Sequence, residues 1–187
     1  MELWKACEDG DIEEVQRLLQ NEQININWQD SQLKTPFFCA CENGQIDIVK
    51  LLLKDQRVDF NKVANEGFSP FWFLCWSGES EVVELLLGYE RVDVNKAEGF
   101  YGSAPIYIAC HEGHIEIVKL LLNDLRIDIN KADRYGKTPF WIACLRGHID
   151  IVKYFLAFGR EVDIKKKDNN GETVLDIKGN EKKILGG

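Results

Sequence analysis

The sequence has no long hydrophobic run, and it is poor in positive charge. A membrane-spanning helix needs about 20 consecutive apolar residues, and no stretch of this chain supplies them. Lys and Arg total 23 against 31 for Asp and Glu, so the formal net charge is −8. An acidic balance disfavours the phosphate backbone of nucleic acid as a partner. We therefore expect a soluble protein whose partners are neither membranes nor nucleic acids.

A secretory signal is also lacking, because the chain begins at a predicted helix rather than at a basic and then apolar leader. The expected location is therefore the cytoplasm, with the nucleus as the alternative. No linker rich in Pro, Gly or Ser interrupts the sequence, which predicts one continuous domain. We expect this domain to be a monomer.

Catalytic and ligand-binding motifs are equally scarce. Histidine occurs only at His111, His114 and His148. No Ser-His-Asp set, phosphate-binding loop or metal-ligand spacing can be recognised. An enzyme needs polar groups that converge on one site, and the sequence pattern indicates none. We therefore expect no enzymatic activity, no cofactor and no metal site.

What the sequence does contain is a repeated pair of short helices. Residues 138–156 (TPFWIACLRGHIDIVKYFL) begin with Thr138, which can cap a helix, and Pro139, which suits its first turn. Gly147 is placed where a helix usually ends, and apolar residues then recur at helical spacing. Equivalent segments start at residues 35, 69, 104 and 173, with a degenerate copy at the start of the chain, so the period is 34 or 35 residues. A constant period in this range indicates a stacked solenoid.

The copies resemble the ankyrin-repeat family in four features: the Thr-Pro start, the A-C-x-x-G-H turn, the I-V-x-L-L-L helix and the D-x-N that follows it. These features cover nearly the whole chain. The resemblance implies an all-α solenoid of helix-turn-helix units joined by β-hairpin-like loops. It also implies a non-catalytic adaptor that binds a partner protein through the concave face, formed by the hairpin tips and the first helices. In the loops we expect short turns rather than long strands, with the clearest tips at residues 133–136 and 168–171.

The predicted repeats span residues 1–29, 30–63, 64–98, 99–132 and 133–167, followed by a shortened C-terminal cap at 168–187. Two departures from the family pattern stand out. The helix ending L-L-x-x-G-A-D is replaced by L-K-D-Q-R-V-D at residues 53–59, without glycine and one residue longer. This accounts for a period of 34 where the family has about 33. The tip before Ala104 also gains one residue.

Five of the six cysteines occupy the same position in successive repeats, and Cys39 is the additional one; the five are Cys7, Cys41, Cys75, Cys110 and Cys144. Equivalent positions in packed helices lie roughly 8–10 Å apart, whereas a disulfide needs Cα atoms closer than about 7 Å. We therefore expect reduced thiols that pack as small apolar groups. The alternative function is a thiol-based redox or metal-responsive protein that uses this cysteine ladder.

Another repeat position is aromatic in every copy: Trp4, Phe38, Trp72, Tyr107 and Trp141. Packing between adjacent repeats is the favoured interpretation, and a binding stripe is the alternative. The resemblance implies that His114 and His148 brace the turn between the two helices. The asparagines of the D-x-N motif are expected to hold the turn between repeats by hydrogen bonds, and in some ankyrin proteins they are hydroxylated on the β-carbon: Asn27, Asn61, Asn95 and Asn130.

Positions that vary between copies are the candidates for partner contact, because a position that must pack stays uniform. Those just before the turn glycine include Trp76, His111, Leu145 and Arg146. The loop tips offer Phe68, Phe100, Tyr101, Arg134 and Tyr135. Trp, Tyr and Arg dominate the energy of many protein interfaces. We predict one aromatic patch over the middle repeats, and the alternative is a set of scattered surface aromatics without a role.

Overall fold

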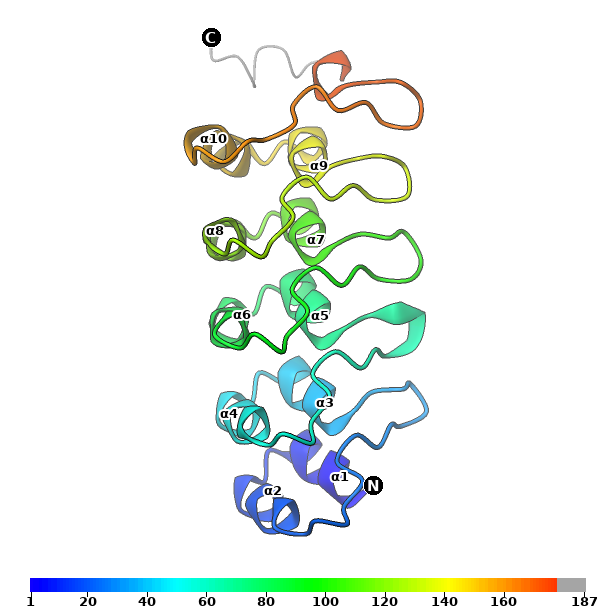
Figure 1. The fold of residues 1–187 in the computed structure, drawn as a ribbon, viewed down its shortest axis with the longest axis vertical. Helices are drawn as coiled ribbons and strands as arrows, with labels where there is room; N and C mark the ends of the chain where they lie inside the picture. Colours follow the sequence, from blue (N-terminus) through cyan, green and yellow to red (C-terminus); the bar gives the residue numbers. More distant parts are fainter. Residues whose placement is uncertain (178–187) are drawn as a thin grey trace.

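The computed structural model describes residues 1–177 as a row of helix pairs (Figure 1). The α-helices of this part are α1 (Glu2–Asp9), α2 (Ile12–Leu19), α3 (Pro36–Glu42), α4 (Ile46–Lys54), α5 (Pro70–Ser77), α6 (Ser80–Leu87), α7 (Pro105–Glu112), α8 (Ile115–Asn123), α9 (Pro139–Arg146) and α10 (Ile149–Ala157). Short 3-10 turns occupy Asn65–Gly67 and Val174–Asp176. The predicted cap is described as far as residue 177, and its remainder, 178–187, lies outside the described residues.

The helices form two layers, and a row of loops projects beyond one of them. The odd-numbered helices lie between the even-numbered helices and the loop tips (Figure 1). No strand occurs in residues 1–177, so the loops consist of turns, as expected. The all-α solenoid predicted from the sequence is confirmed. The odd-numbered helices and the loop tips together form the face that we call concave.

The odd-numbered helices from α3 to α9, which we call the inner helices, begin at the residues that the repeat pattern predicts. The hydroxyls of Thr35, Ser69 and Thr138 each accept a hydrogen bond of 3.1 Å from the backbone N–H three residues ahead. Proline occupies the next position, where its missing N–H leaves no helical hydrogen bond unmade. The cap residue of α7 is Ala104, which makes no side-chain cap. This helix start therefore relies on its proline and on packing.

The turn between the helices of a pair depends on glycine. All four glycines singled out by the sequence pattern have the predicted positive φ, between 63° and 90°: Gly44, Gly78, Gly113 and Gly147. Gly113 also makes room for the next repeat, because an added Cβ would lie 2.6 Å from the ring of His148. That ring places Nε2 3.0 Å from the carbonyl oxygen of His111, and His114 makes the same contact with Trp76 at 2.9 Å. These two histidines brace the turns as the resemblance implies.

One apolar core runs through all five repeats. All six cysteines are buried, with exposed fractions of 0–3%. The aromatic column is also buried at Phe38, Trp72, Tyr107 and Trp141, whereas Trp4 is partly exposed. The packing interpretation of both columns is therefore confirmed, although Trp72 and Tyr107 also reach the concave face.

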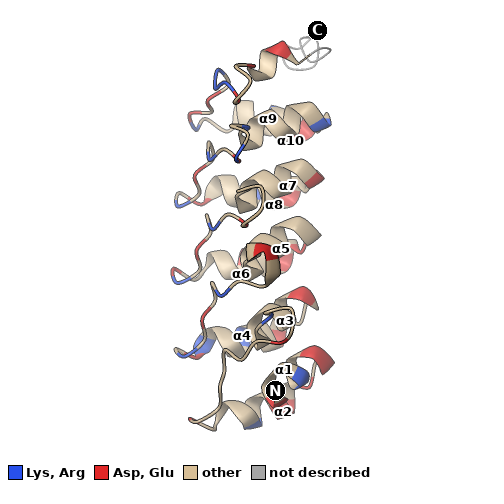
Figure 2. Cartoon of the chain, turned by 90° about the vertical axis from the view of Figure 1, so that its right-hand side faces the viewer, with Lys and Arg blue, Asp and Glu red and all other residues tan. Residues whose placement is uncertain are grey.

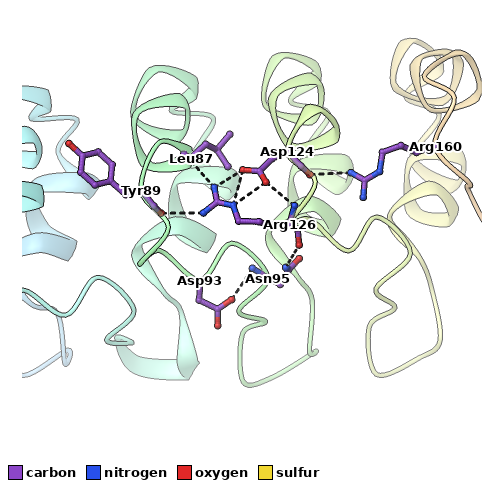
Figure 3. Close-up of polar contacts among 7 residues, drawn as sticks. All are labelled: Leu87, Tyr89, Asp93, Asn95, Asp124, Arg126 and Arg160. Atoms are coloured by element: carbon purple, nitrogen blue, oxygen red, sulfur yellow. Dashed lines mark hydrogen bonds and ion pairs between the residues drawn. The ribbon is translucent and has the colours of Figure 1, made fainter.

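A series of arginines, which we call the arginine ladder, joins successive repeats. Its members lie in the loops that follow the even-numbered helices, which we call the outer loops. Arg126 donates hydrogen bonds to the carbonyl oxygens of Leu87 at 2.6 Å and Tyr89 at 3.2 Å, both in the preceding repeat (Figure 3). Its guanidinium also pairs with Asp124 at 2.5 Å, which lowers the pKa of that carboxyl. The last carbonyl groups of a helix have no partner within the helix, so the arginine supplies one from the next repeat. Arg57 and Arg160 likewise bond carbonyl groups at the end of α2 and α8, and Arg91 bonds the carbonyl groups of Gln56 and Val58 in the loop after α4.

A second series of hydrogen bonds, made by asparagines and called the asparagine ladder, runs beside the arginine ladder. Asn95 donates from Nδ2 to the carbonyl oxygen of Arg126 at 2.6 Å and accepts from the N–H of Asp128 at 2.9 Å (Figure 3 shows the first of these bonds). The equivalent pairs of bonds are made by Asn27, Asn61 and Asn130. The expected hydrogen-bonding role of this motif is therefore confirmed. Hydroxylation of these asparagines stays a prediction.

The first testable prediction separates the two reasons for glycine at position 113. Gly113 and Gly159 have nearly equal φ values, 85° and 84°, so alanine at either site carries left-handed strain of about 1–2 kcal/mol. Only Gly113 faces a neighbour, since nothing lies within 4 Å of a Cβ at Gly159. Gly113→Ala should lose about 1 kcal/mol more, because His148 must leave its hydrogen bond. Urea unfolding measures both variants, and equal losses would contradict the bracing role of His148.

The second prediction concerns the thiols. Burial raises the pKa of Cys7, Cys39 and Cys144 to about 12, and the thiolate is the reactive species. A thiol reagent should label few cysteines in the native protein and all six in denaturant. Because unfolded thiols ionise near pH 8.5 while the buried ones stay protonated, the free energy of unfolding should fall as the pH rises above about 8.5. Rapid native labelling of Cys41 or Cys110, or a disulfide between any two cysteines, would contradict this.

The third prediction tests the arginine ladder. Arg126→Met removes the donors of two carbonyl groups and the partner of Asp124, and it should cost about 2 kcal/mol of unfolding free energy. Arg126→Lys keeps the charge but cannot bridge both carbonyl groups, so it should restore only part of the loss. The matched control is Arg17→Met, because Arg17 is exposed and pairs only with Glu14 on its own helix. Urea denaturation of the three variants is the measurement, and similar stabilities for Arg126→Met and Arg17→Met would exclude a stabilising ladder.

Candidate functional site

A groove of about 900 Å³ hollows the concave face across repeats 3 to 5. Loop tips form its wall, and α5, α7 and α9 form its floor. We call it the central groove. Its volume lies within the range of roughly 300–1,000 Å³ that is usual for ligand-binding clefts.

The central groove brings together seven of the nine residues that the sequence singled out for partner contact. They are Phe68, Phe100, Tyr101, His111, Tyr135, Leu145 and Arg146. They come from three loop tips and two inner helices, and successive tips or helices lie about one period apart in the sequence. Their shared location is a result of stacking, and their role in binding stays a prediction.

Aromatic rings form the wall of the central groove. Phe100 and Tyr101 meet edge to face with centroids 4.6 Å apart, and Tyr101 lies 6.3 Å from Tyr135 on the next tip. Their exposed fractions are 62%, 51% and 53%. Phe68 is more buried and stacks on Trp72 at 4.6 Å. The wall therefore presents a continuous row of rings with much of their apolar surface in water.

The tip that carries Phe100 and Tyr101 is one residue longer than its neighbours. It closes where the N–H of Glu98 donates to the carbonyl oxygen of Ser103 at 3.2 Å, whereas the tip at 133–137 closes one residue sooner. The Glu98 carboxylate is almost fully buried and accepts from the N–H groups of Phe100 at 2.5 Å and Tyr101 at 2.7 Å. It also accepts from the N–H of Ser103 at 3.0 Å and its hydroxyl at 3.1 Å. The longer loop is held by a glutamate where the next tip has an aspartate, because the side chain must reach further.

Hydrogen bonds between successive tips keep the wall in place. The N–H of Gly99 donates to the carbonyl oxygen of Glu66 at 2.8 Å, and the N–H of Arg134 donates to that of Tyr101 at 2.8 Å. The Arg134 guanidinium folds back onto the carbonyl oxygen of Gly99 at 2.6 Å. Arg134 therefore does not line the central groove. The prediction that Arg134 belongs to the aromatic patch is therefore corrected, because its side chain joins two tips.

Trp76 also lies outside the central groove. Its ring is 45% exposed and packs edge-on against Phe73, with centroids 5.3 Å apart. Phe73 in turn contacts Phe38 of repeat 2 at 5.3 Å. These contacts place Trp76 in a second aromatic row that leads toward repeat 2. The sequence predicts one aromatic patch, and the structure corrects this to two groups of rings. The tip wall consists of Phe68, Phe100, Tyr101 and Tyr135, and the helix row consists of Phe38, Phe73 and Trp76.

The floor contains residues that the sequence interpretation had assigned to packing or had not considered. Trp72 and Tyr107 belong to the aromatic column, and the indole N–H of Trp72 donates to the carbonyl oxygen of Ser103 at 2.9 Å. Ile108 and Ile142 come from the position after that column. This position varies between copies, and that variation was the available signal: Lys5, Cys39, Phe73, Ile108 and Ile142.

Tyr107 carries the buried polar group of the floor. Burial and the neighbouring Asp133 carboxylate, with which it hydrogen-bonds, raise the pKa of Tyr107. Its hydroxyl therefore stays protonated and can donate to that carboxylate. Asp133 also accepts from the N–H groups of Tyr135 and Lys137, both at 2.9 Å. The Asp133 carboxylate thus accepts hydrogen bonds from three donors beneath the tip wall.

The edge of the central groove near repeat 5 is basic. Arg146 contacts Nε2 of His111 through Nη2, and Nδ1 of His111 lies 2.7 Å from Glu112. Both contacts are hydrogen bonds only if the proton is on Nδ1, which makes the imidazole neutral. Lys137 holds its ammonium 4.3 Å from the centre of the Trp141 ring. Figure 2 shows acidic residues at the C-terminal ends of α1, α3 and α7 and basic ones at that of α9.

Within residues 1–177 no group of three His, Cys, Asp or Glu side chains is placed to hold a metal ion. In the same part of the chain no helix has both the length and the apolar character needed to cross a membrane. The buried thiols have raised pKa values, whereas a reactive thiol needs a lowered one.

Comparisons with known proteins identify the family to which this fold belongs. Two sequence profiles of ankyrin repeats match: one of many copies at residues 106–156 and one of three copies at residues 3–64. The crystal structure of EF0377, an ankyrin repeat protein, superposes with a TM-score of 0.83 and 31% sequence identity over 94% of this chain and 88% of that one. No curated protein sequence gives a match. Ankyrin repeats generally act as protein–protein interaction modules and are typically non-catalytic. The chain belongs to the ankyrin-repeat family.

Proposed function

We propose that this chain binds a partner protein through its concave face, with the central groove as the main contact and without catalysis. The observation that carries the proposal is the row of exposed rings on two successive tips. Phe100, Tyr101 and Tyr135 are each more than half exposed and border a groove of about 900 Å³. Exposed aromatic surface beside a concave floor is the arrangement in which interface hot spots form.

The rigidity of the wall also supports this function. Ordering loops and side chains on binding costs about 0.5–1.5 kcal/mol for each flexible side chain. Here the tips are already joined to one another through Gly99 and Arg134, and the longest tip is held by the four bonds to Glu98. A partner therefore meets a surface that needs little further ordering.

The thiol-based alternative has less support. A redox or metal-responsive cysteine needs access and a stabilised thiolate. Burial instead raises the pKa of Cys7, Cys39 and Cys144 to about 12. The other three are buried as deeply: Cys41, Cys75 and Cys110. We therefore assign the cysteine ladder to the core and the partner-binding role to the concave face.

The fourth prediction locates the interface. A photoreactive phenylalanine analogue at position 135 should form a covalent adduct with a partner in extract of the native cell, and the same group at position 125 should not. Leu125 is the matched control because it is 87% exposed but lies in an outer loop, away from the central groove. For the partner identified in this way, Tyr135→Ala should weaken binding by about 2 kcal/mol. Leu125→Ala should leave the affinity unchanged, and unfolding curves check that both variants fold.

Trp76→Ala measures how far the interface extends. If the partner covers only the central groove, Trp76→Ala binds as tightly as the parent, because Trp76 belongs to the separate helix row. A loss equal to that of Tyr135→Ala would extend the interface to the helix row of repeat 3, which leads toward repeat 2. Adducts at position 125 together with undiminished binding by Tyr135→Ala would place the interface on the outer loops and refute the proposal.

A further inference from the structure

The two cations of the central groove have no acidic partner of their own. Among residues 1–177, Lys137 and Arg146 form no ion pair, although both line the groove. Several other cations of the chain do form ion pairs, as Lys34 does with Glu42 at 2.7 Å and Arg126 with Asp124 at 2.5 Å. The groove thus holds two positive charges that are available to a negatively charged ligand.

The carboxylates that face the central groove do not supply this complement. Glu98 and Asp133 are 4% and 9% exposed, and their oxygens are occupied by N–H and O–H donors of the tips and of Tyr107. Glu66 is exposed, but it belongs to the tip of repeat 3, at the opposite end of the groove from α9. The accessible charge therefore changes from acidic at repeat 3 to basic at repeat 5.

Both cations are held in position without being neutralised. Lys137 lies over the ring of Trp141, and Arg146 is oriented by the ring of His111. An ammonium has three donors and a guanidinium has five, so each retains donors for a ligand. Guanidinium groups in particular match the geometry of a carboxylate. The basic edge is thus prepared for a negatively charged oxygen.

An apolar surface lies beside this basic edge. Tyr135, which borders it, is two residues from Lys137 and 6.3 Å from Tyr101. Leu145, 46% exposed, precedes Arg146 at the end of α9. A ligand that places an oxygen on the cations will therefore bring its neighbouring groups against rings and an aliphatic side chain.

We propose that the central groove recognises a partner segment in which an Asp or Glu side chain stands next to a large apolar residue. The carboxylate binds at the basic edge, where Lys137 and Arg146 are the available cations, and the apolar side chain packs between Tyr101, Tyr135 and Leu145. This inference rests on the proposed partner-binding function and adds the chemistry of the segment. Charge complementarity also sets its direction, with the acidic residue at repeat 5 and any basic residue toward Glu66.

The test uses a displayed library of random short peptides selected on the intact chain. The parent should enrich peptides with Asp or Glu beside Phe, Tyr, Trp or Leu. The strongest peptide is then synthesised with an amidated C-terminus, so that its carboxylate comes from a side chain, and its Kd is measured by fluorescence anisotropy. Arg146→Gln and Lys137→Gln should each weaken binding about tenfold. The matched control is Lys153→Gln, because Lys153 lies exposed on α10 in the same repeat but on the outer layer.

A second comparison separates a direct ion pair from a general effect of charge. Replacing the peptide's acidic residue by its amide should weaken binding to the parent by more than about tenfold, because both cations lose their partner. The same replacement should weaken binding to Arg146→Gln by a smaller factor, because only the contact with Lys137 is left to break. Circular dichroism confirms that the variants fold, and Lys137→Gln provides an independent variant if Arg146→Gln does not.

The outcomes distinguish this inference from the function on which it rests. If the parent enriches apolar peptides without acidic residues, the central groove binds partners but the proposed chemistry is wrong. If Lys153→Gln weakens binding as much as Arg146→Gln, the acidic preference reflects net charge and the site is refuted. If the parent enriches no peptide family, the partner-binding function of the groove fails, and the inference fails with it.

Discussion

Side-chain hydrogen bonds to the main chain of the neighbouring repeat are the interaction on which the rest of this structure depends. Arg126 reaches the last carbonyl group of α6, Asn95 bonds the backbone of the next repeat, and His148 bonds the end of α7. A single helix pair cannot bury its apolar faces alone, so it needs neighbours at a fixed distance and rotation. Polar bonds are directional, and they set this register more strictly than the apolar core does.

The register determines what the concave face looks like. Because every repeat is placed on the last by the same bonds, tips that are a full period apart in sequence become neighbours. Tyr101 and Tyr135 form a ring contact, and the N–H of Arg134 bonds the carbonyl oxygen of Tyr101. The irregular features of individual repeats therefore add up to one surface. The inserted tip residue, held by Glu98, is the clearest case, since it adds a ring to the wall without disturbing the stack.

The division of labour between positions follows from this arrangement. Uniform positions, such as the cysteines and the turn glycines, maintain the stack, and they leave little freedom for chemistry. Variable positions carry no such constraint, and their side chains decide what the concave face can bind. In repeat 5 they place Leu145 and Arg146 beside the tip rings, whereas in repeat 2 the same positions hold Glu42 and Asn43. The family fold thus supplies a surface, and a few substitutions give it aromatic and basic character.

The repeat period, the helix starts at Thr35 and Thr138, the positive φ of Gly113 and the burial of the cysteines were all predictable from the sequence, because each depends on local geometry or on repetition. Seven of the nine candidate contact residues line the central groove, and the sequence singles them out because irregular positions stand out against a regular pattern. Only the tertiary structure decided in which direction individual side chains point and which neighbours they contact. It directs Arg134 onto the carbonyl oxygen of Gly99 and Trp76 onto Phe73, and it opens the floor at Ile108 and Ile142. These outcomes depend on contacts between repeats, and a pattern along one chain does not contain such contacts.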